Sequence, residues 1–113
     1  MRIEVKGRNG VTVGNELRER IEKRLDKVAR QVPQPAQCDV ELSEQRNRST
    51  TEQVAELTLR LKGTTLRARD ASDNMTQAVN EAADELARQV KRHLEKKRGR
   101  RVSSKVQPDA AAG

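Results

Sequence analysis

A chain of 113 residues, 33% of them hydrophobic and none aromatic, has room for one domain built around a small aliphatic core. Residues 1–7, MRIEVKG, alternate apolar with polar side chains, which excludes the uninterrupted apolar stretch of a signal peptide or membrane span and favours a cytoplasmic protein. The net charge of +7 indicates a polyanionic partner, either nucleic acid or an anionic membrane surface, and the single cysteine excludes an internal disulfide.

The first part of the chain predicts a strand, a helix and a second strand. The alternation in residues 2–7 is typical of a strand. An apolar residue then recurs every three or four positions, which predicts a helix that begins near Gly14 and ends before Pro33. Its apolar stripe consists of Leu17, Ile21, Leu25, Val28 and Val32. The next alternating stretch, residues 38–42, predicts the second strand.

The second part predicts two more strands and a second helix. The polar stretch 44–53, EQRNRSTTEQ, is typical of a hairpin loop, and it leads into the longest alternating stretch, residues 55–61. A short apolar stretch after a turn at Gly63 predicts the fourth strand. Ser72 or Asp73 is expected to cap the second helix. The apolar stripe of that helix consists of Met75, Val79, Ala82, Leu86, Val90 and Leu94.

The predicted order of elements is therefore β-α-β-β-β-α. Each strand has one apolar face and each helix one apolar stripe, which favours an α+β fold of two layers, a four-stranded sheet with both helices packed on one face. The opposite face of the sheet is then expected to lie in water. Residues 1–98 form the expected domain, and residues 99–113, which lack periodicity, are expected to be a flexible basic tail or the start of a linker.

A dense cationic run lies at the end of the second helix. Residues 88–101 contain eight Lys and Arg and one Glu, and they account for all of the net charge. The helix dipole favours cations near a C-terminus, but it acts over the last turn only, whereas like charges along the whole run repel one another unless an anion neutralises them. At about 100° per residue, most of these cations face away from the apolar stripe. The cations assigned to RNA binding in this run are Arg88, Lys91, Arg92, Lys96, Lys97 and Arg98.

The first helix carries a second basic stripe. Arg20, Arg24 and Lys27 follow the spacing i, i+4, i+7 along one flank, beside the apolar stripe. A solvated, salt-bridged face is the alternative interpretation of one such stripe, but cationic surfaces on two helices favour RNA. Since the chain has no Phe, Tyr or Trp on which bases could stack, recognition is expected to depend on phosphates and shape.

Nothing in the sequence indicates an enzyme. His93 lies on the apolar side of the second helix, and the sequence places no Ser, Cys or carboxylate to form a catalytic pair with it. Cys38, in an apolar strand, is expected to be a small buried hydrophobe, so neither a metal site nor a cofactor is expected. GRNG, residues 7–10, matches the GxxG loop of KH domains, but it follows a strand instead of joining two helices, which favours a plain turn.

Four stretches of the sequence are similar to one protein family. They are GRN at 7–9, LRERIEKRLDK at 17–27, LKGTTLRAR at 61–69 and SDNMTQAVNEAADELARQVKR at 72–92. Over residues 1–98 the chain resembles the ribosome hibernation promoting factor family, which includes the ribosome-associated inhibitor A proteins. The family pattern in the last stretch is matched at Ser72, Asp73, Met75, Ala78, Leu86, Arg88 and Gln89. It is not matched at Asn74, Thr76, Asn80 and Glu85, the last of which stands where the family often has a Lys.

The resemblance implies the β-α-β-β-β-α fold and a stress or stationary-phase factor that binds the small ribosomal subunit and its rRNA. Such a factor lies in the decoding channel, where messenger RNA and the A- and P-site tRNAs would sit, and inhibits translation by occupancy, without chemistry. The resemblance assigns backbone binding to Arg8, Arg24, Lys27, Arg88 and Arg92. Arg20, Lys91, Lys96, Lys97 and Arg98 are added from the charge distribution. Long family members continue through a linker into a dimerising domain, so dimerisation is expected only if such a domain follows.

Two other functions are compatible with the sequence. A generic double-stranded RNA-binding domain has the same layout of a sheet with two helices on one face. Tight binding to any duplex RNA would favour it. The other alternative is a small adaptor whose basic tail docks on an acidic protein or an anionic membrane, although the second helix lacks the Trp, Phe and exposed Leu of a membrane-surface helix.

Overall fold

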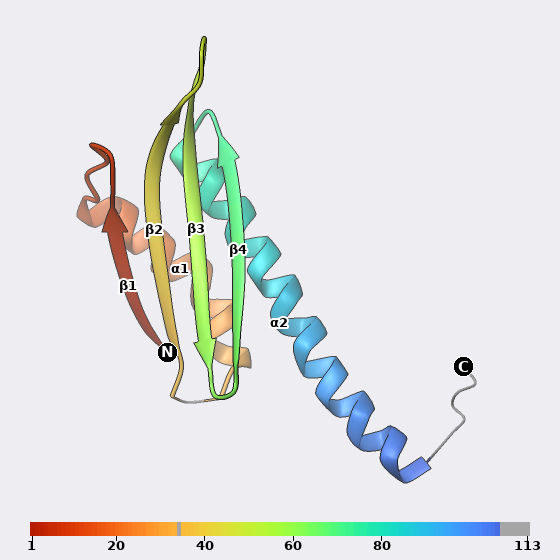
Figure 1. The fold of residues 1–113 in the computed structure, drawn as a ribbon. Coiled ribbons are helices and arrows are strands. Elements are labelled where there is room, and N and C mark those ends of the chain that lie inside the picture. The colour runs from red at the N-terminus through yellow and green to blue at the C-terminus, as the bar shows by residue number, and fades with distance from the viewer. Residues whose placement is uncertain (34, 107–113) are drawn as a thin grey trace.

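The computed structural model describes residues 1–33 and 35–106, with side chains described as far as Lys96. Its elements are β1 (Arg2–Gly7), α1 (Asn15–Gln31), β2 (Gln37–Arg46), β3 (Thr51–Leu61), β4 (Thr64–Ser72) and α2 (Met75–Val106). They follow the predicted β-α-β-β-β-α order, which can be traced from red to blue in Figure 1.

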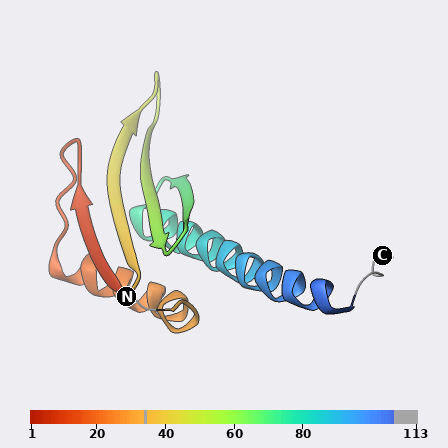
Figure 2. The same cartoon turned by 60° about the horizontal axis from the view of Figure 1, so that its bottom comes forward.

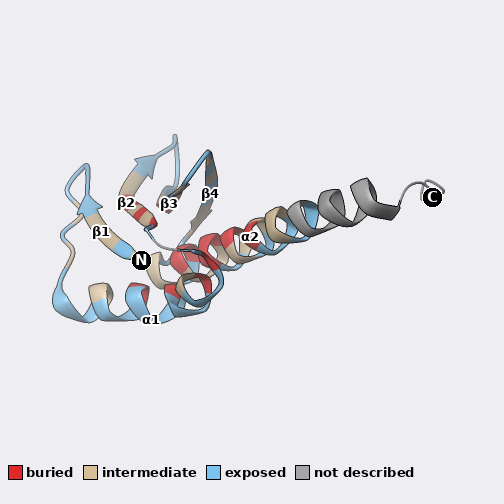
Figure 3. Cartoon of the chain, turned by 90° about the horizontal axis from the view of Figure 1, so that it is seen from below, coloured by how far each residue is buried: buried red, intermediate tan, exposed pale blue. Residues whose placement is uncertain are grey.

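The four strands form one sheet in the order β1-β2-β3-β4. β1 runs parallel to β2, and α1 lies in the connection between them, whereas β2, β3 and β4 follow one another as antiparallel hairpins. Both helices cover the same face of the sheet, which Figure 3 shows from below. The predicted two-layer α+β fold is therefore confirmed.

The core lies between the sheet and the two helices. Residues that pair across neighbouring strands point to the same face, so the register aligns apolar side chains in rows. One such row consists of Val5, Val40, Leu57 and Ala68. The helices bury Ile21, Leu25 and Val28 of α1 and Ala78, Val79, Ala82, Ala83, Leu86 and Val90 of α2. Figure 3 shows these buried segments next to the strands, so each helix turns its predicted apolar stripe to the sheet.

The connection from β1 towards α1 begins with a turn at GRNG, in agreement with the plain-turn interpretation. The N–H of Val11 donates to the carbonyl oxygen of Arg8 at 3.1 Å. Gly10 has a φ of 85°, in the left-handed region that glycine adopts without strain, and a Cβ on Gly7 would collide with the carbonyl oxygen of Val11. The N–H of Arg8 donates to the carbonyl oxygen of Leu42 at 2.8 Å, which ties the turn to β2.

The prediction that residues 44–53 are a hairpin loop is wrong in extent. β2 continues to Arg46 and β3 begins at Thr51, so the loop comprises residues 47–50 only. Between Gln53 and the hairpin tip, no other strand of the described sheet pairs with these two strands. Their polar side chains are compatible with strands because water reaches both faces of the pair there.

The predicted cap of α2 is also wrong. Asn74 takes the capping position: its Oδ1 accepts a hydrogen bond from the N–H of Gln77 at 3.1 Å. Ser72, Asp73 and Asn74 are all residues of the capping type, so local sequence does not choose among them. Because β4 runs to Ser72, the chain is free to enter the helix only two residues later.

The backbone of α2 continues through Gly99 to Val106, so residues 99–106 are helical where the sequence predicts a tail. A single glycine costs a helix interior about 1 kcal/mol relative to alanine, which does not stop it. At about 1.5 Å per residue the helix is about 48 Å long, and its C-terminal part extends beyond the sheet (Figures 1 and 2). Residues 107–113 of the predicted tail lie outside the described residues, and the domain boundary at residue 98 stays a prediction.

Candidate nucleic-acid interface

The two helices lie side by side and run in the same general direction (Figures 1 and 2). Where they meet, Nη2 of Arg24 on α1 lies 3.8 Å from Oδ2 of Asp84 on α2. Arg20 and Lys27 stand about one turn before and after Arg24 on the same flank, and both are exposed. The basic stripe of α1 therefore borders α2, which is the arrangement that a shared surface requires.

The cations of α2 spread around its outer side. Lys91 stands two turns after Asp84 on the flank turned toward α1, whereas Arg88 lies opposite the buried stripe. Arg92 and Lys96 border a hollow of about 210 Å³ between α2 and β4. These four cations are exposed, so the positive surface extends from α1 across α2 toward the edge strand.

Seven predicted RNA-binding residues thus share one face of the molecule. We call Arg20, Arg24, Lys27, Arg88, Lys91, Arg92 and Lys96 the helix-face cations. Arg8 is not brought together with them, because its Nη2 lies 3.1 Å from Oε2 of Glu41, a residue of the opposite sheet face. The side chains of Lys97 and Arg98 lie outside the described residues. The RNA-binding role of all ten residues stays a prediction.

A carboxylate lies among the helix-face cations. Oε1 of Glu85 accepts hydrogen bonds from Nε and Nη2 of Arg88 at 3.1 and 2.9 Å, and Oε2 accepts one from Nε2 of Gln89 at 3.3 Å. These bonds hold the pKa of Glu85 below its ordinary value. Because the folded state has the lower pKa, the pair contributes stability above the unfolded-state pKa, and this contribution is lost as the pH falls through the folded-state pKa. The ion pair of Glu85 with Arg88 was not predicted from the sequence, although its i, i+3 spacing could have indicated it.

Replacing Glu85 by glutamine is expected to tighten RNA binding about 1.4- to fivefold at low salt. Arg88 must leave Glu85 before it can bind a phosphate, and an exposed ion pair contributes about 0.2–1 kcal/mol. The measurement is the dissociation constant for a short RNA. The control is Glu81→Gln, which changes the net charge equally. Glu81 accepts a hydrogen bond from Gln77 and not from an arginine. Equal gains in both variants would show that only net charge matters.

The single cysteine lies outside the helix-face surface. Cys38 is fully buried, and burial raises the pKa of its thiol to about 12, which keeps it protonated. Among the described residues no group of three or more His, Cys, Asp or Glu could hold a metal ion. Within the same part of the chain, every helix is too short or too polar to cross a membrane.

A family model described as Sigma 54 modulation protein / S30EA ribosomal protein matches residues 3–98. The chain belongs to this family. The match runs from β1 into α2, so it includes all of the helix-face cations. Membership of the S30EA family confirms the resemblance found in the sequence.

Relatives of the S30EA chain agree with this assignment. A curated protein from Picosynechococcus sp., named ribosome hibernation promotion factor, is 30% identical over 104 residues, which cover 90% of this chain and 53% of the relative. The chain thus spans about half the length of that relative. The crystal structure of the Thermus thermophilus Protein Y N-terminal domain is 28% identical with a TM-score of 0.71, covering 82% of this chain and 99% of that one. A ribosomal subunit interface protein from Coxiella burnetii, 22% identical with a TM-score of 0.68 and coverages of 84% and 99%, shares the fold.

Proposed function

We propose that this protein is a ribosome hibernation factor that binds the small ribosomal subunit in the decoding channel. It acts in stress or stationary phase and inhibits translation by occupying the place of messenger RNA and of the A- and P-site tRNAs. The observation that carries the proposal is the S30EA family match over residues 3–98, together with the name of the Picosynechococcus relative.

The helix-face cations supply the means of binding. They project from two helices whose apolar stripes are held by the core, so they can meet phosphates without a large loss of conformational entropy. Lysine and arginine contacts to the rRNA backbone give affinity, and the shape of the paired helices gives the fit. Inhibition needs no covalent step, because a channel filled by protein excludes tRNA. Arg8, Lys97 and Arg98 are proposed as further backbone contacts.

Binding to empty small subunits and exclusion from tRNA-filled ones is the expected result of a co-sedimentation experiment. The purified protein is mixed with small subunits, with and without bound tRNA and messenger RNA, and the bound fraction is measured across a salt series. Affinity is expected to fall with a slope of log K against log salt between about −5 and −6 if all seven helix-face cations contact phosphates.

Two results would contradict the proposal. Equal binding to empty and tRNA-filled subunits would place the protein outside the decoding channel. Binding to a plain RNA duplex as tight as to the small subunit would favour a generic double-stranded RNA-binding domain. The aligned part of the chain covers 53% of the Picosynechococcus relative. Pairing of ribosomes is expected only where a dimerising domain accompanies this one.

A further inference from the structure

A hollow of about 210 Å³ lies between α2 and β4, at one edge of the sheet. It is lined by Leu66 of β4 and by Gln89, Arg92, His93 and Lys96 of α2. Gln89, His93 and Lys96 follow the spacing i, i+4, i+7, so they share one flank of the helix. We call this site the α2–β4 hollow. It is continuous with the helix-face surface, because Arg92 and Lys96 belong to both.

A hydrogen bond joins the two walls of the α2–β4 hollow. Nε2 of Gln89 donates to the carbonyl oxygen of Arg67 at 2.7 Å, and Arg67 is the neighbour of Leu66 in β4. Among the described residues no donor bonds Oε1 of Gln89. The bond therefore fixes α2 against the edge of β4, and it leaves an oxygen that can accept a hydrogen bond from a ligand.

The charge of the α2–β4 hollow is positive. Arg92 and Lys96 are exposed, and neither forms an ion pair with another described residue. Glu85 stands one turn before Gln89 on the same flank, but its Oε1 already accepts two hydrogen bonds from Arg88. A phosphate that enters the hollow therefore meets two cations that form no ion pair among the described residues.

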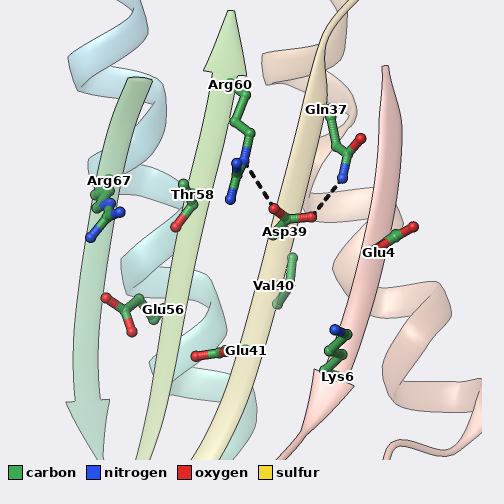
Figure 4. A pocket seen from close by; sticks show the side chains of 10 residues that line it. All are labelled: Glu4, Lys6, Gln37, Asp39, Val40, Glu41, Glu56, Thr58, Arg60 and Arg67. Atoms are coloured by element: carbon green, nitrogen blue, oxygen red, sulfur yellow. Dashed lines mark hydrogen bonds and ion pairs between the residues drawn. The ribbon is translucent and has the colours of Figure 1, made fainter. Parts of the chain in front are cut away.

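A larger hollow, of about 470 Å³, lies on the outer face of the sheet, opposite the helices (Figure 4). There Nε of Arg60 donates to Oδ2 of Asp39 at 3.1 Å. Oε2 of Glu41 lies 3.1 Å from Nη2 of Arg8, and Glu41 stands opposite Glu56 in the register of β2 and β3. Cations and carboxylates thus neutralise one another on the outer face, whereas the charged residues that line the α2–β4 hollow are both cations.

His93 carries the only aromatic ring of the chain, which has no Phe, Tyr or Trp and a single histidine. It is half-buried, as is Leu66, so the ring and the aliphatic side chain give the α2–β4 hollow an apolar part next to the exposed cations. Unpaired RNA bases stack on rings of this kind, histidine included, while cations bind the adjoining phosphates. The hollow thus combines the two kinds of group that a nucleotide needs.

We propose that the α2–β4 hollow binds one unpaired nucleotide of the RNA, with its base against His93 and Leu66 and its phosphate at Arg92 and Lys96. Sites for drug-sized ligands have volumes of about 300–1,000 Å³, and the smaller hollow fits a group of the size of one base. The proposal rests on the proposed RNA binding and deepens it. A base contact selects loops and bulges, which contacts to phosphates alone do not distinguish.

The test compares two RNA duplexes that differ in one base. Each duplex has a single bulged nucleotide at the same place, an adenosine in one and an abasic residue in the other, so the number of phosphates is equal. Fluorescence anisotropy of the end-labelled RNA measures both dissociation constants at one fixed salt concentration. The protein is expected to bind the adenosine bulge at least about fivefold more tightly, which is the lower end of the effect of one stacked base.

Two substitutions at His93 show whether its ring carries the base contact. H93A is expected to abolish the preference for the adenosine bulge and to change the affinity for the abasic RNA little. H93F keeps a ring and is expected to retain the preference. The matched control K96A removes a phosphate contact, so it is expected to weaken the binding of both RNAs by the same factor. Melting temperatures confirm that the three variants fold.

Equal binding of the two RNAs by the unaltered protein, or no binding of the adenosine bulge, would overturn the inference. A preference that persists in H93A, or that is lost in H93F, would do the same. Co-sedimentation with small subunits tests the proposed function separately. Binding to subunits without a base preference would contradict the inference alone, and a base preference without binding to subunits would contradict the proposed function alone.

Discussion

The double substitution R88E/R92E is expected to abolish detectable binding to the small ribosomal subunit while the fold stays intact. Both side chains are exposed on the outer side of α2, and the neighbouring Leu86 and Val90 are fully buried, so the cations stand on a fixed support. Hydrogen bonds to charged groups contribute about 1.5–3 kcal/mol each. Loss of two such bonds weakens binding at least about 100-fold, and the new carboxylates add repulsion. The measurement is affinity at one fixed salt concentration, with circular dichroism to confirm folding.

Two controls separate a local site from a general effect of charge. R46E/R48E changes the net charge equally at the exposed tip of the β2–β3 hairpin and is expected to weaken binding far less. Deletion of residues 100–113 is expected to weaken it modestly, because these residues follow the part of α2 that the sheet supports. A deletion more damaging than R88E/R92E would identify the cationic run as a non-specific polycation.

Truncation of Leu57 to alanine is expected to lower the free energy of unfolding by about 3–4 kcal/mol. Leu57 is 1% exposed in the central strand β3, where it pairs with Val40 and Ala68 in the core. Removal of a buried leucine side chain costs about 2–5 kcal/mol through lost burial and the cavity that remains. A typical domain has a free energy of unfolding of about 5–15 kcal/mol, so this loss is a large part of the total stability. Urea denaturation measures the loss.

Thr58→Ala provides the matched control for the core substitution. Thr58 is the next residue of β3 and points to the outer face, where it is half-buried. Its truncation is expected to cost at most about 1 kcal/mol, the range of strand propensities. Similar losses of unfolding free energy at both positions would mean that the sheet does not have one buried and one solvent-exposed face.

The sequence by itself determined the elements and their buried faces. The alternation in residues 38–42 and 55–61 identified the inner face of two strands, and the three-to-four spacing identified the stripe that α2 buries through Leu86 and Val90. These signals are strong because the geometry of a strand or helix repeats along the chain itself. Local ends were weaker: Ser72, Asp73 and Asn74 all suit a cap. Because β4 runs to Ser72, Asn74 takes the position, and its Oδ1 accepts the hydrogen bond from the N–H of Gln77.

Only the tertiary structure decided which residues of different elements meet. The family resemblance put Arg8 and Arg24 in one binding set, but Arg24 lies against Asp84 of α2 while Arg8 lies against Glu41 of the outer sheet face. The facing pair of Glu41 and Glu56 was likewise hidden, because it depends on the register of two strands. Periodicity tells which side of its own element a residue occupies, whereas neighbours across elements are fixed by pairing register and packing, which no single stretch of sequence contains.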